Sequence, residues 1–284
     1  LQLTFEGALR LLKSPQRYPN GRPHPAWLAA RRNRLTASRF SSACSALTSE
    51  KVSRELVSDL LTLPESSAAQ AGRFGIQNEE RARQAYIKYR GRGNVPITYD
   101  PQKTGRNDGN IDDSDQNDFH QQPGQASTAV QEVGIAVFLD APWLAASPDG
   151  LVIENGSAVG LLEVKTAQSW AMVRDKVRGA LPDKWLYQVQ GGMKITSNVL
   201  GVDLRWCDVF IWTPEHFECR RVFADNELWD RTVFPALETF YFRDFLPQVV
   251  AYRLKTRKRK SGRGSLRPGQ NDLRPETGRR SEKR

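Results

Sequence analysis

The sequence predicts an α/β (α+β) domain in which a central mixed β-sheet is flanked by helices. Apolar residues recur at helical spacing near both ends of the chain, and two strand–turn–strand patterns occur in its second half. With 284 residues and 39% hydrophobic content, the chain can bury one sizeable core. We therefore expect one main domain over residues 1–252 and a separate tail over residues 253–284.

Helices are predicted from the apolar periodicity and from the residues that end each periodic stretch. Near the N-terminus, Phe40, Cys44 and Leu47 recur at helical spacing. Pro235 is expected to break the last helix, because proline cannot donate a backbone hydrogen bond. The expected helical stretches are residues 1–63, 77–89, 168–195 with a restart at Asp183, and 225–246.

Strands are predicted where apolar and β-branched residues lie between turn residues. Asn155-Gly156 is a strong signal for a tight hairpin turn, and Pro214-Glu215 turns a second hairpin. The expected strands are residues 131–139, the stretches around Val152 and Leu162, and residues 208–213 and 217–223.

Residues 100–129 differ in composition from the rest of the domain. Gly, Asp, Asn and Gln dominate there, which predicts a flexible surface insertion. Its acidic cluster lacks the Gly at position 6 and the Glu at position 12 of an EF-hand loop, so a solvated loop is favoured over a calcium site. The cluster consists of Asp112, Asp113, Asp115 and Asp118.

The formal net charge of +10 belongs to the tail. Residues 253–284 contain 13 basic and 3 acidic residues, whereas residues 1–252 contain 29 of each. The tail is predicted to be disordered, because its basic, Pro- and Gly-containing sequence cannot bury enough apolar area to fold. Its basic run from Lys255 to Lys260 is typical of a nuclear localisation signal or a phosphate-binding arm, and solvated disorder is equally compatible with it.

No apolar run is long enough to span a membrane, and the N-terminus lacks a signal-peptide pattern. The protein is therefore expected to be soluble and intracellular, in the nucleus of a eukaryotic cell and otherwise in the cytoplasm, without a membrane partner. Cys44, Cys207 and Cys219 are too widely spaced for a disulfide framework or a zinc site, which favours buried thiols.

Glu163-Val164-Lys165 is the one place where an acidic residue, one spacer and a lysine occur together. With 32 acidic residues and 12 lysines in 284 positions, one such triplet is expected by chance. The triplet therefore means little without its context.

The predicted hairpin supplies that context. A three-residue loop over 155–157 would place Asp149 opposite Glu163, whereas a loop of two or four residues would shift the pairing by one. Opposed residues point to the same face with Cβ atoms about 5 Å apart, so the two carboxylates could share a hard divalent cation. Lys165 would lie on that face and could orient a water or stabilise a developing oxyanion, while Val164 points into the core.

These residues belong to five short blocks that occur in a fixed order. The blocks are Arg31 with Thr36-Ala37-Ser38; Gly75 with Glu79, Ala82, Arg83 and Tyr86; Ser147-Pro148-Asp149-Gly150; Leu161-Leu162-Glu163-Val164-Lys165; and Tyr187-Gln188-Val189-Gln190. Spread between residues 27 and 213, they strongly resemble the lambda-exonuclease, or YqaJ, branch of the PD-(D/E)XK nucleases, to which herpesvirus alkaline nucleases are related. The resemblance implies a restriction-endonuclease-like core.

The resemblance also implies a role for individual residues. The implied catalytic residues are Asp149, Glu163, Lys165, Gln188 and Glu79. The implied ligands of Mg²⁺, for which Mn²⁺ would substitute, are Asp149, Glu163 and the Val164 carbonyl. Arg31, Ser38 and Ser147 would bind the 5′ phosphate of the substrate.

The implied function is metal-dependent hydrolysis of DNA from the 5′ ends of duplexes, in recombination or repair. Trimers occur in this family and a single-strand-annealing protein is a candidate partner, although the sequence identifies no surface for either. Three alternatives stay open: an endonuclease, an RNA-cleaving enzyme, and a non-catalytic nucleic-acid-binding module. The first two arise because the same metal site cuts any phosphodiester that reaches it.

Each residue also has a plain structural interpretation. Glu79, on the inward face of its helix, could simply pair with Arg83 four residues on. Ser38 could be only a helix cap, and Gln188 only a surface polar residue. Asp149 before a glycine is a common turn pair. The conjunction of the five blocks favours the catalytic interpretation over these.

Overall fold

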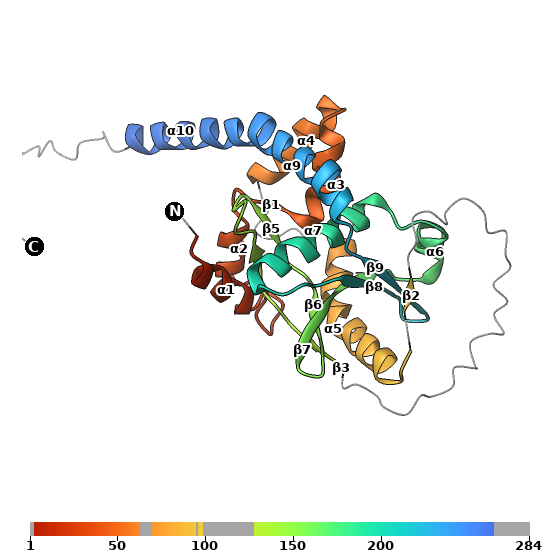
Figure 1. The fold of residues 1–284 in the computed structure, drawn as a ribbon. Helices are drawn as coiled ribbons and strands as arrows, with labels where there is room; N and C mark the ends of the chain where they lie inside the picture. Colours follow the sequence, from red (N-terminus) through yellow and green to blue (C-terminus); the bar gives the residue numbers. More distant parts are fainter. Residues whose placement is uncertain (1–2, 63–69, 95, 99–127, 264–284) are drawn as a thin grey trace, which may run out of the picture.

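The structure is a computed structural model, and it describes residues 3–62, 70–94, 96–98 and 128–263 (Figure 1). It confirms the predicted α/β class, because a mixed sheet of six strands is flanked by helices and accompanied by a smaller sheet of three strands. Most of the predicted insertion, including Asp112, Asp113, Asp115 and Asp118, lies outside the described residues.

The central sheet has the strand order β2-β9-β8-β7-β6-β3. Its strands are β2 (Ile97–Thr98), β3 (Thr128–Gln131), β6 (Gly150–Glu154), β7 (Ser157–Thr166), β8 (Trp206–Trp212) and β9 (Phe217–Phe223). β7 runs antiparallel to β6 and parallel to β8, so it lies in the middle of the sheet with a neighbour on each side. Both predicted hairpins, β6–β7 and β8–β9, are confirmed.

The β6–β7 turn differs from the predicted three-residue loop. Asn155 and Gly156 have φ angles of 51° and 79°, as a tight two-residue turn requires, and Glu154 pairs with Ser157. A β-bulge follows between Val152 and Ile153, and beyond it Gly150 pairs with Leu162. The bulge adds one residue to β7, so the predicted register is restored at the end of the hairpin that carries the candidate site.

The smaller sheet has the order β1-β5-β4, formed by β1 (Leu35–Thr36), β4 (Ala136–Val137) and β5 (Leu144–Ala146). The prediction of one strand over residues 131–139 is wrong, because this stretch contributes to β3 and to β4, in different sheets. Between them, Gly134 and Ile135 donate backbone hydrogen bonds to the last carbonyls of helix α1 (Phe5–Lys13). The helix end competes with the sheet for these backbone groups.

Helices cover both faces of the central sheet (Figure 1). The remaining α-helices are α2 (Pro25–Arg31), α3 (Phe40–Ala46), α4 (Glu50–Thr62), α5 (Gln70–Gly91), α6 (Arg174–Val177), α7 (Asp183–Leu200), α8 (Asn226–Leu228), α9 (Phe234–Thr239) and α10 (Leu246–Arg263). Two 3₁₀ turns, η1 (Ala37–Arg39) and η4 (Trp170–Met172), and two π-helical segments, η5 (Trp229–Val233) and η6 (Phe240–Phe245), complete the described elements.

Alternation along β7 assigns each of its residues to one of two hydrophobic clusters. Leu162 packs with Tyr86 of α5, whereas Leu161 packs with Val189 and Met193 of α7. The residues that follow Leu161 at a spacing of two therefore face α7. This alternation places Glu163 and Lys165 on one face of β7, as predicted, and that face is the one covered by α7.

The C-terminal helical region departs from the prediction. Pro235 falls in the first turn of α9, where proline is tolerated, and the π-helical segments on either side carry the helix past it without a break. The helical run continues through α10 to Arg263, so predicted disorder is wrong for residues 253–263; residues 264–284 lie outside the described part.

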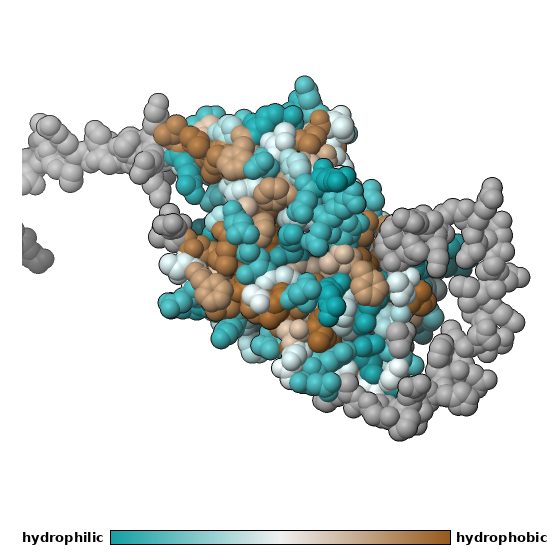
Figure 2. Space-filling model, in the orientation of Figure 1, coloured by the Kyte–Doolittle hydropathy of each residue, from teal (hydrophilic) through white to brown (hydrophobic). Residues whose placement is uncertain are grey.

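Helix α10 leaves the body of the protein beyond Val249, which is the last buried residue among those of α10 whose burial is described (residues 246–256) (Figure 1). Val250, Tyr252 and Leu254 are 50%, 53% and 54% exposed. Figure 2 shows hydrophobic surface along this projecting helix, next to hydrophilic surface.

Two predictions from composition can be compared with the structure. Cys44, Cys207 and Cys219 are all free thiols, of which the last two are buried and the first is half-buried. None of the helices in the described part of the chain is long and apolar enough to cross a membrane.

Candidate active site

Asp149 lies in a bend directly before β6, and its side chain is held against β7. The backbone N–H of Val164 donates a 2.7 Å hydrogen bond to Oδ2 of Asp149. The next residue, Gly150, begins β6, where a Cβ atom would lie only 2.3 Å from Cγ1 of Val130. The Asp-Gly pair is therefore the entry to a strand rather than a turn, and the glycine is required by close packing.

Glu163, Lys165 and Gln188 form a closed triangle of hydrogen bonds between β7 and α7. The Lys165 ammonium donates to Oε1 of Glu163 at 2.8 Å and to Oε1 of Gln188 at 2.9 Å. Nε2 of Gln188 donates to the same Glu163 oxygen at 2.6 Å. Because Glu163 is only 7% exposed, this network fixes the lysine in a largely desolvated setting.

The carboxylates of the site repel one another. Burial, followed by the charges of Glu163 and Glu79, raises the pKa of Asp149 well above its ordinary value. The Lys165 charge and the Val164 hydrogen bond act in the opposite direction without cancelling the effect. A bound cation would relieve this repulsion.

Glu79 of α5 forms the predicted ion pair and also lies electrostatically close to Glu163. Its Oε1 accepts a 3.1 Å hydrogen bond from Arg83, which is the predicted i,i+4 pair. Burial nevertheless raises the pKa of Glu79, and the charge of Glu163 adds to this effect, whereas Arg83 and Arg17 oppose it. Glu79 is thus a paired residue that still lies within electrostatic reach of the site.

The donor set is chemically suited to a hard divalent cation, although it is not a preformed cage. Within the described ranges, no three or more Asp, Glu, His or Cys side chains are grouped closely enough to hold a metal. In the same residues, Oδ1 of Asp149 and Oε2 of Glu163 accept no hydrogen bond, so each carboxylate keeps one oxygen available. Carboxylate oxygens are the ligands that Mg²⁺ prefers, so the predicted metal site, including the Val164 carbonyl, stays a prediction that the residues fit.

The predicted phosphate-binding residues gather around the end of α2. Arg31 donates a 3.2 Å hydrogen bond to Thr36 Oγ1, directly before η1. Thr36 makes no side-chain capping bond, and Ser38 lies half-buried inside this single 3₁₀ turn. The expected helix cap at this position is therefore not formed. Ser147 Oγ accepts a 3.0 Å hydrogen bond from Trp27 Nε1, which joins α2 to the loop before Asp149.

Two residues that sequence reasoning missed also contact this region. Nε2 of Gln16 donates to the carbonyls of Val133 at 3.0 Å and Pro148 at 2.8 Å. These bonds fix the backbone directly before Asp149. Arg17 lies near both Glu79 and Arg31, since its charge affects the pKa of each. These residues lie in a Pro-rich segment without periodicity, so the sequence carried no signal for their position.

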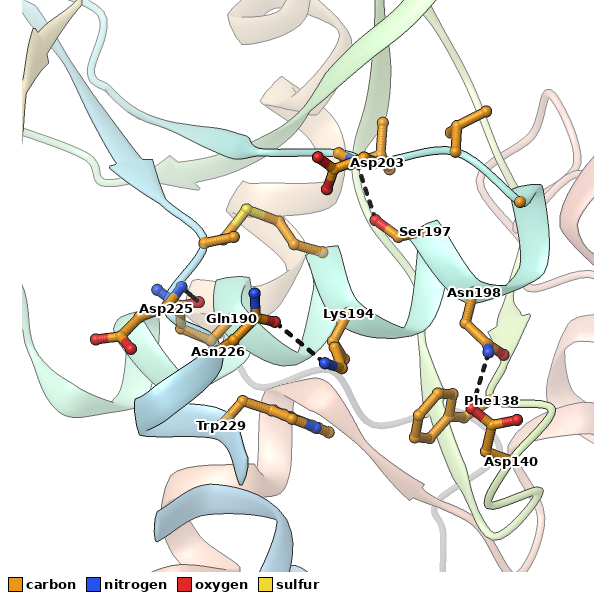
Figure 3. A pocket seen from close by; sticks show the side chains of 15 residues that line it. Phe138, Asp140, Gln190, Lys194, Ser197, Asn198, Asp203, Asp225, Asn226 and Trp229 are labelled. Atoms are coloured by element: carbon orange, nitrogen blue, oxygen red, sulfur yellow. Dashed lines mark hydrogen bonds between the residues drawn. The ribbon is translucent and has the colours of Figure 1, made fainter. Parts of the chain in front are cut away.

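A cavity of about 360 Å³ at the other end of α7 is distinct from this site (Figure 3). Its polar side chains are already paired: Asn198 donates to Asp140 at 3.0 Å, and Lys194 donates to Asn226 at 3.1 Å. Gln190 is 4% exposed and bonds the backbone at Phe223 and Asp225. These contacts hold α7 to its neighbours, so we assign this cavity a structural role.

Comparison with known families identifies the domain. Residues 26–198, more than half of the chain, match the family described as the YqaJ-like viral recombinase domain. The chain belongs to this family. Every site residue predicted from the motif blocks lies within the YqaJ-like match, whereas Arg17 lies outside it. The family expected from the sequence is thus confirmed.

Solved structures show the same fold as this YqaJ-like protein. The alkaline exonuclease LHK-Exo from Laribacter hongkongensis matches with a TM-score of 0.53 and 23% identity, over 85% of this chain and 100% of its own. Its complex with dAMP matches with a TM-score of 0.52 and 22% identity, over the same shares of both chains. At these identities the likeness concerns the fold. No functionally curated protein matches the sequence significantly.

Proposed function

We propose that this protein is a metal-dependent DNA exonuclease that hydrolyses phosphodiester bonds from the 5′ ends of duplex DNA, in recombination or repair. The observation that carries the proposal is the Glu163–Lys165–Gln188 triangle beside Asp149 in a YqaJ-like domain. The similar fold of an alkaline exonuclease, and of its complex with a deoxynucleotide, favours DNA as the substrate.

The metal-binding role falls to Asp149 and Glu163, with the Val164 carbonyl as a further oxygen donor. Mg²⁺, or Mn²⁺ in its place, would supply Lewis acidity and an activated water when bound there. The raised pKa of Asp149 supports this assignment, because carboxylates that repel one another bind a cation favourably. Glu79 adds negative charge from α5 while Arg83 keeps its side chain in place.

Lys165 is assigned to the phosphate that is cleaved. Its ammonium is held by Glu163 and Gln188, so it is oriented toward the carboxylates instead of moving freely in solvent. A fixed positive charge in a desolvated site stabilises the negative charge that develops on the phosphate oxygens. Gln188 acts through Lys165 as a positioning residue.

Recognition of a duplex end is assigned to Arg31, Ser38 and Ser147. Arg31 carries a guanidinium that suits phosphate, and the Trp27–Ser147 hydrogen bond connects its surroundings to the loop that carries Asp149. A terminal phosphate held there would be near the carboxylates. This arrangement supports cleavage close to an end, and no observation in the structure favours free internal cleavage.

The test is digestion of end-labelled duplex DNA with Mg²⁺ by the wild type, Asp149→Asn and Lys165→Ala. Asp203→Asn is the matched control, because the Asp203 side chain is 82% exposed and lies outside the site. Both site variants should be inactive and the control fully active. Equal digestion by all four proteins would refute the assignment, and cleavage of closed circular DNA or RNA would favour the alternative nucleases. Metal-independent binding without turnover would favour a binding module.

A further inference from the structure

Two guanidinium groups approach the same tryptophan ring beside the candidate active site. Cζ of Arg31 is 4.4 Å from the centre of the Trp27 ring, and Cζ of Arg17 is 5.9 Å from it. The indole N–H of Trp27 donates to Ser147, two residues before Asp149. The arginine pair is therefore anchored to the loop that carries a candidate metal ligand.

Neither arginine forms an ion pair with a carboxylate in the described part of the chain. Arg31 donates to the Thr36 hydroxyl at 3.2 Å, and Arg17 donates to the Gly21 carbonyl at 3.1 Å. Elsewhere, the partly buried Arg90 and Arg221 each have a carboxylate partner. A desolvated guanidinium without a counter-ion is unfavourable, so an anion would stabilise the buried Arg31, which shares the Trp27 ring with Arg17.

The electrostatics of Arg31 agree with this geometry. Burial, followed by the charges of Arg39 and Arg17, lowers the pKa of Arg31 to about 10. Arg39 pairs with Asp59 at 3.4 Å and Arg17 interacts electrostatically with Glu79, so both of these charges are partly balanced, whereas Arg31 has no carboxylate ion pair among the described residues. An anion bound between Arg17 and Arg31 would remove the repulsion between them.

Arg17 also lies within electrostatic reach of Glu79. Its positive charge opposes the effect of burial on the pKa of Glu79. Arg17 thus lies within electrostatic reach of two candidate site residues, Arg31 for the phosphate and Glu79 among the carboxylates. An anion beside it would be at the boundary between the two parts of the site.

We propose that Arg17 and Arg31 together form a two-guanidinium site for the second negative charge of a terminal phosphate monoester, so that Arg17 sets the preference for 5′-phosphorylated ends. The inference rests on the proposed function. A phosphate monoester carries close to two negative charges at neutral pH, because its second pKa is about 6, whereas an internal diester carries one. Two guanidinium groups match the two charges of the monoester, and each can donate two hydrogen bonds to phosphate oxygens.

The experiment measures binding without turnover, in EDTA, to hairpin duplexes with one open end. That end carries a 5′ phosphate, a 5′ methyl phosphate with a single charge, or a 5′ hydroxyl. The proteins are the wild type, Arg17→Gln, Arg17→Lys and the control Arg22→Gln, which changes an exposed arginine of the same segment. Fluorescence anisotropy of a label at the hairpin loop gives each Kd.

The wild type and Arg22→Gln should bind the phosphate end about tenfold more tightly than the methyl phosphate end, a difference of about 1.4 kcal/mol. Arg17→Gln should reduce this ratio to below about twofold and leave the affinity for the hydroxyl end almost unchanged, since that end offers no charge to recognise. Arg17→Lys should give an intermediate ratio, because it keeps the charge but loses the planar fork.

An unchanged ratio in Arg17→Gln would overturn the proposal. Equal weakening at all three ends would also overturn it, because Arg17 would then act through Glu79, general charge or folding. The measurement needs neither metal nor cleavage, so it separates this inference from the proposed function. A protein that discriminates between the ends but never digests DNA contradicts the proposed function alone.

Discussion

The backbone N–H of Val164 donates a 2.7 Å hydrogen bond to Oδ2 of Asp149 and thereby joins the entry of β6 to the central residue of Glu163-Val164-Lys165. The bond makes the two oxygens of Asp149 unequal, because one is occupied and the other is left for a ligand. It also holds Asp149 beside the triplet although a hairpin separates them in the sequence.

Asp149→Asn should abolish activity without unfolding the protein. The amide oxygen can still accept the Val164 hydrogen bond, but a negatively charged metal ligand is lost, so we expect digestion to fall by at least about 100-fold. The metal-free variant should melt at a higher temperature than the wild type, since the repulsion with Glu163 and Glu79 is removed. Digestion assays and thermal melts in EDTA check both effects, and a variant that is active or less stable would contradict this view of the site.

Without metal, the protein should lose stability as the pH rises. The pKa values of Asp149 and Glu79 are raised above the ordinary 3.8 and 4.5, so the folded state binds protons more tightly than the unfolded state does. The stability that these groups contribute is fully present below their ordinary pKa values and is lost as the pH rises through the raised ones.

Thermal melts in EDTA between about pH 4 and pH 8 measure this effect. Asp149→Asn should flatten the profile, and added Mg²⁺ should restore the melting temperature of the wild type at the upper end, because it binds the native state. A wild-type profile that is as flat as that of Asp149→Asn would show that the carboxylates do not repel one another.

The site residues on strands could be predicted from the sequence because side chains two residues apart on a strand always point to the same face. Glu163 and Lys165 share a face in any strand, whereas the register across the hairpin depends on the turn and on any bulge. The predicted three-residue loop was wrong, and the bulge at Val152 and Ile153 compensated for it. No pattern in the sequence predicts that bulge.

Features set by long-range contacts could not be predicted. Arg17 approaches the ring of Trp27, and Trp27 is in turn hydrogen-bonded to Ser147, 120 residues away. The strand expected over residues 131–139 failed for a similar reason, since the end of α1 takes the hydrogen bonds of Gly134 and Ile135 instead. Local patterns specify which elements form, and competition between distant elements decides where they end.

Gln188 and Gln190, neighbours on α7, should have separable roles. Gln188→Ala removes the hydrogen bonds that fix Lys165 and Glu163, so we expect kcat to fall by about 10- to 100-fold with little loss of stability. Gln190→Ala removes two hydrogen bonds to the backbone at Phe223 and Asp225 and should cost about 1 kcal/mol for each, with activity retained in the folded fraction. Urea titrations and initial rates measure the two effects. If Gln188→Ala lost as much stability as Gln190→Ala, Gln188 would be a structural residue as well.

The buried Asp208 network should set the stability of the sheet without affecting chemistry. Asp208 is fully buried, accepts a 2.8 Å hydrogen bond from Tyr86, and binds Arg221 through two hydrogen bonds of 2.7 and 2.9 Å. Asp208→Ala leaves the Arg221 charge without its partner and should cost about 3–5 kcal/mol. Tyr86→Phe removes one hydrogen bond to Asp208 and should lower the free energy of unfolding by a smaller amount, about 1–3 kcal/mol. A urea titration that finds Asp208→Ala as stable as the wild type would mean that solvent reaches the network.

The basic C-terminal region should govern the salt dependence of DNA binding. Residues 253–284 carry 13 of the 42 basic residues, while the rest of the chain is neutral, and Arg253 and Lys255 are exposed on α10. A variant that ends at Tyr252 keeps the buried Val249 and removes residues that are not buried as far as residue 256, so its fold should persist. For every DNA phosphate that the basic region neutralises, its removal should make the slope of log K against log salt shallower by roughly 0.9.

Binding to a blunt duplex between about 50 and 200 mM salt gives these slopes for the full chain and the truncated variant. The truncated variant should bind more weakly at low salt, with a clearly shallower slope, while its ratio of affinities for 5′-phosphate and 5′-hydroxyl ends stays the same. This ratio is the internal control, because the end-recognition residues lie in the first 150 residues of the chain. Identical slopes would show that the basic region is solvated and does not contact DNA, and a changed ratio would show that it reaches the active site.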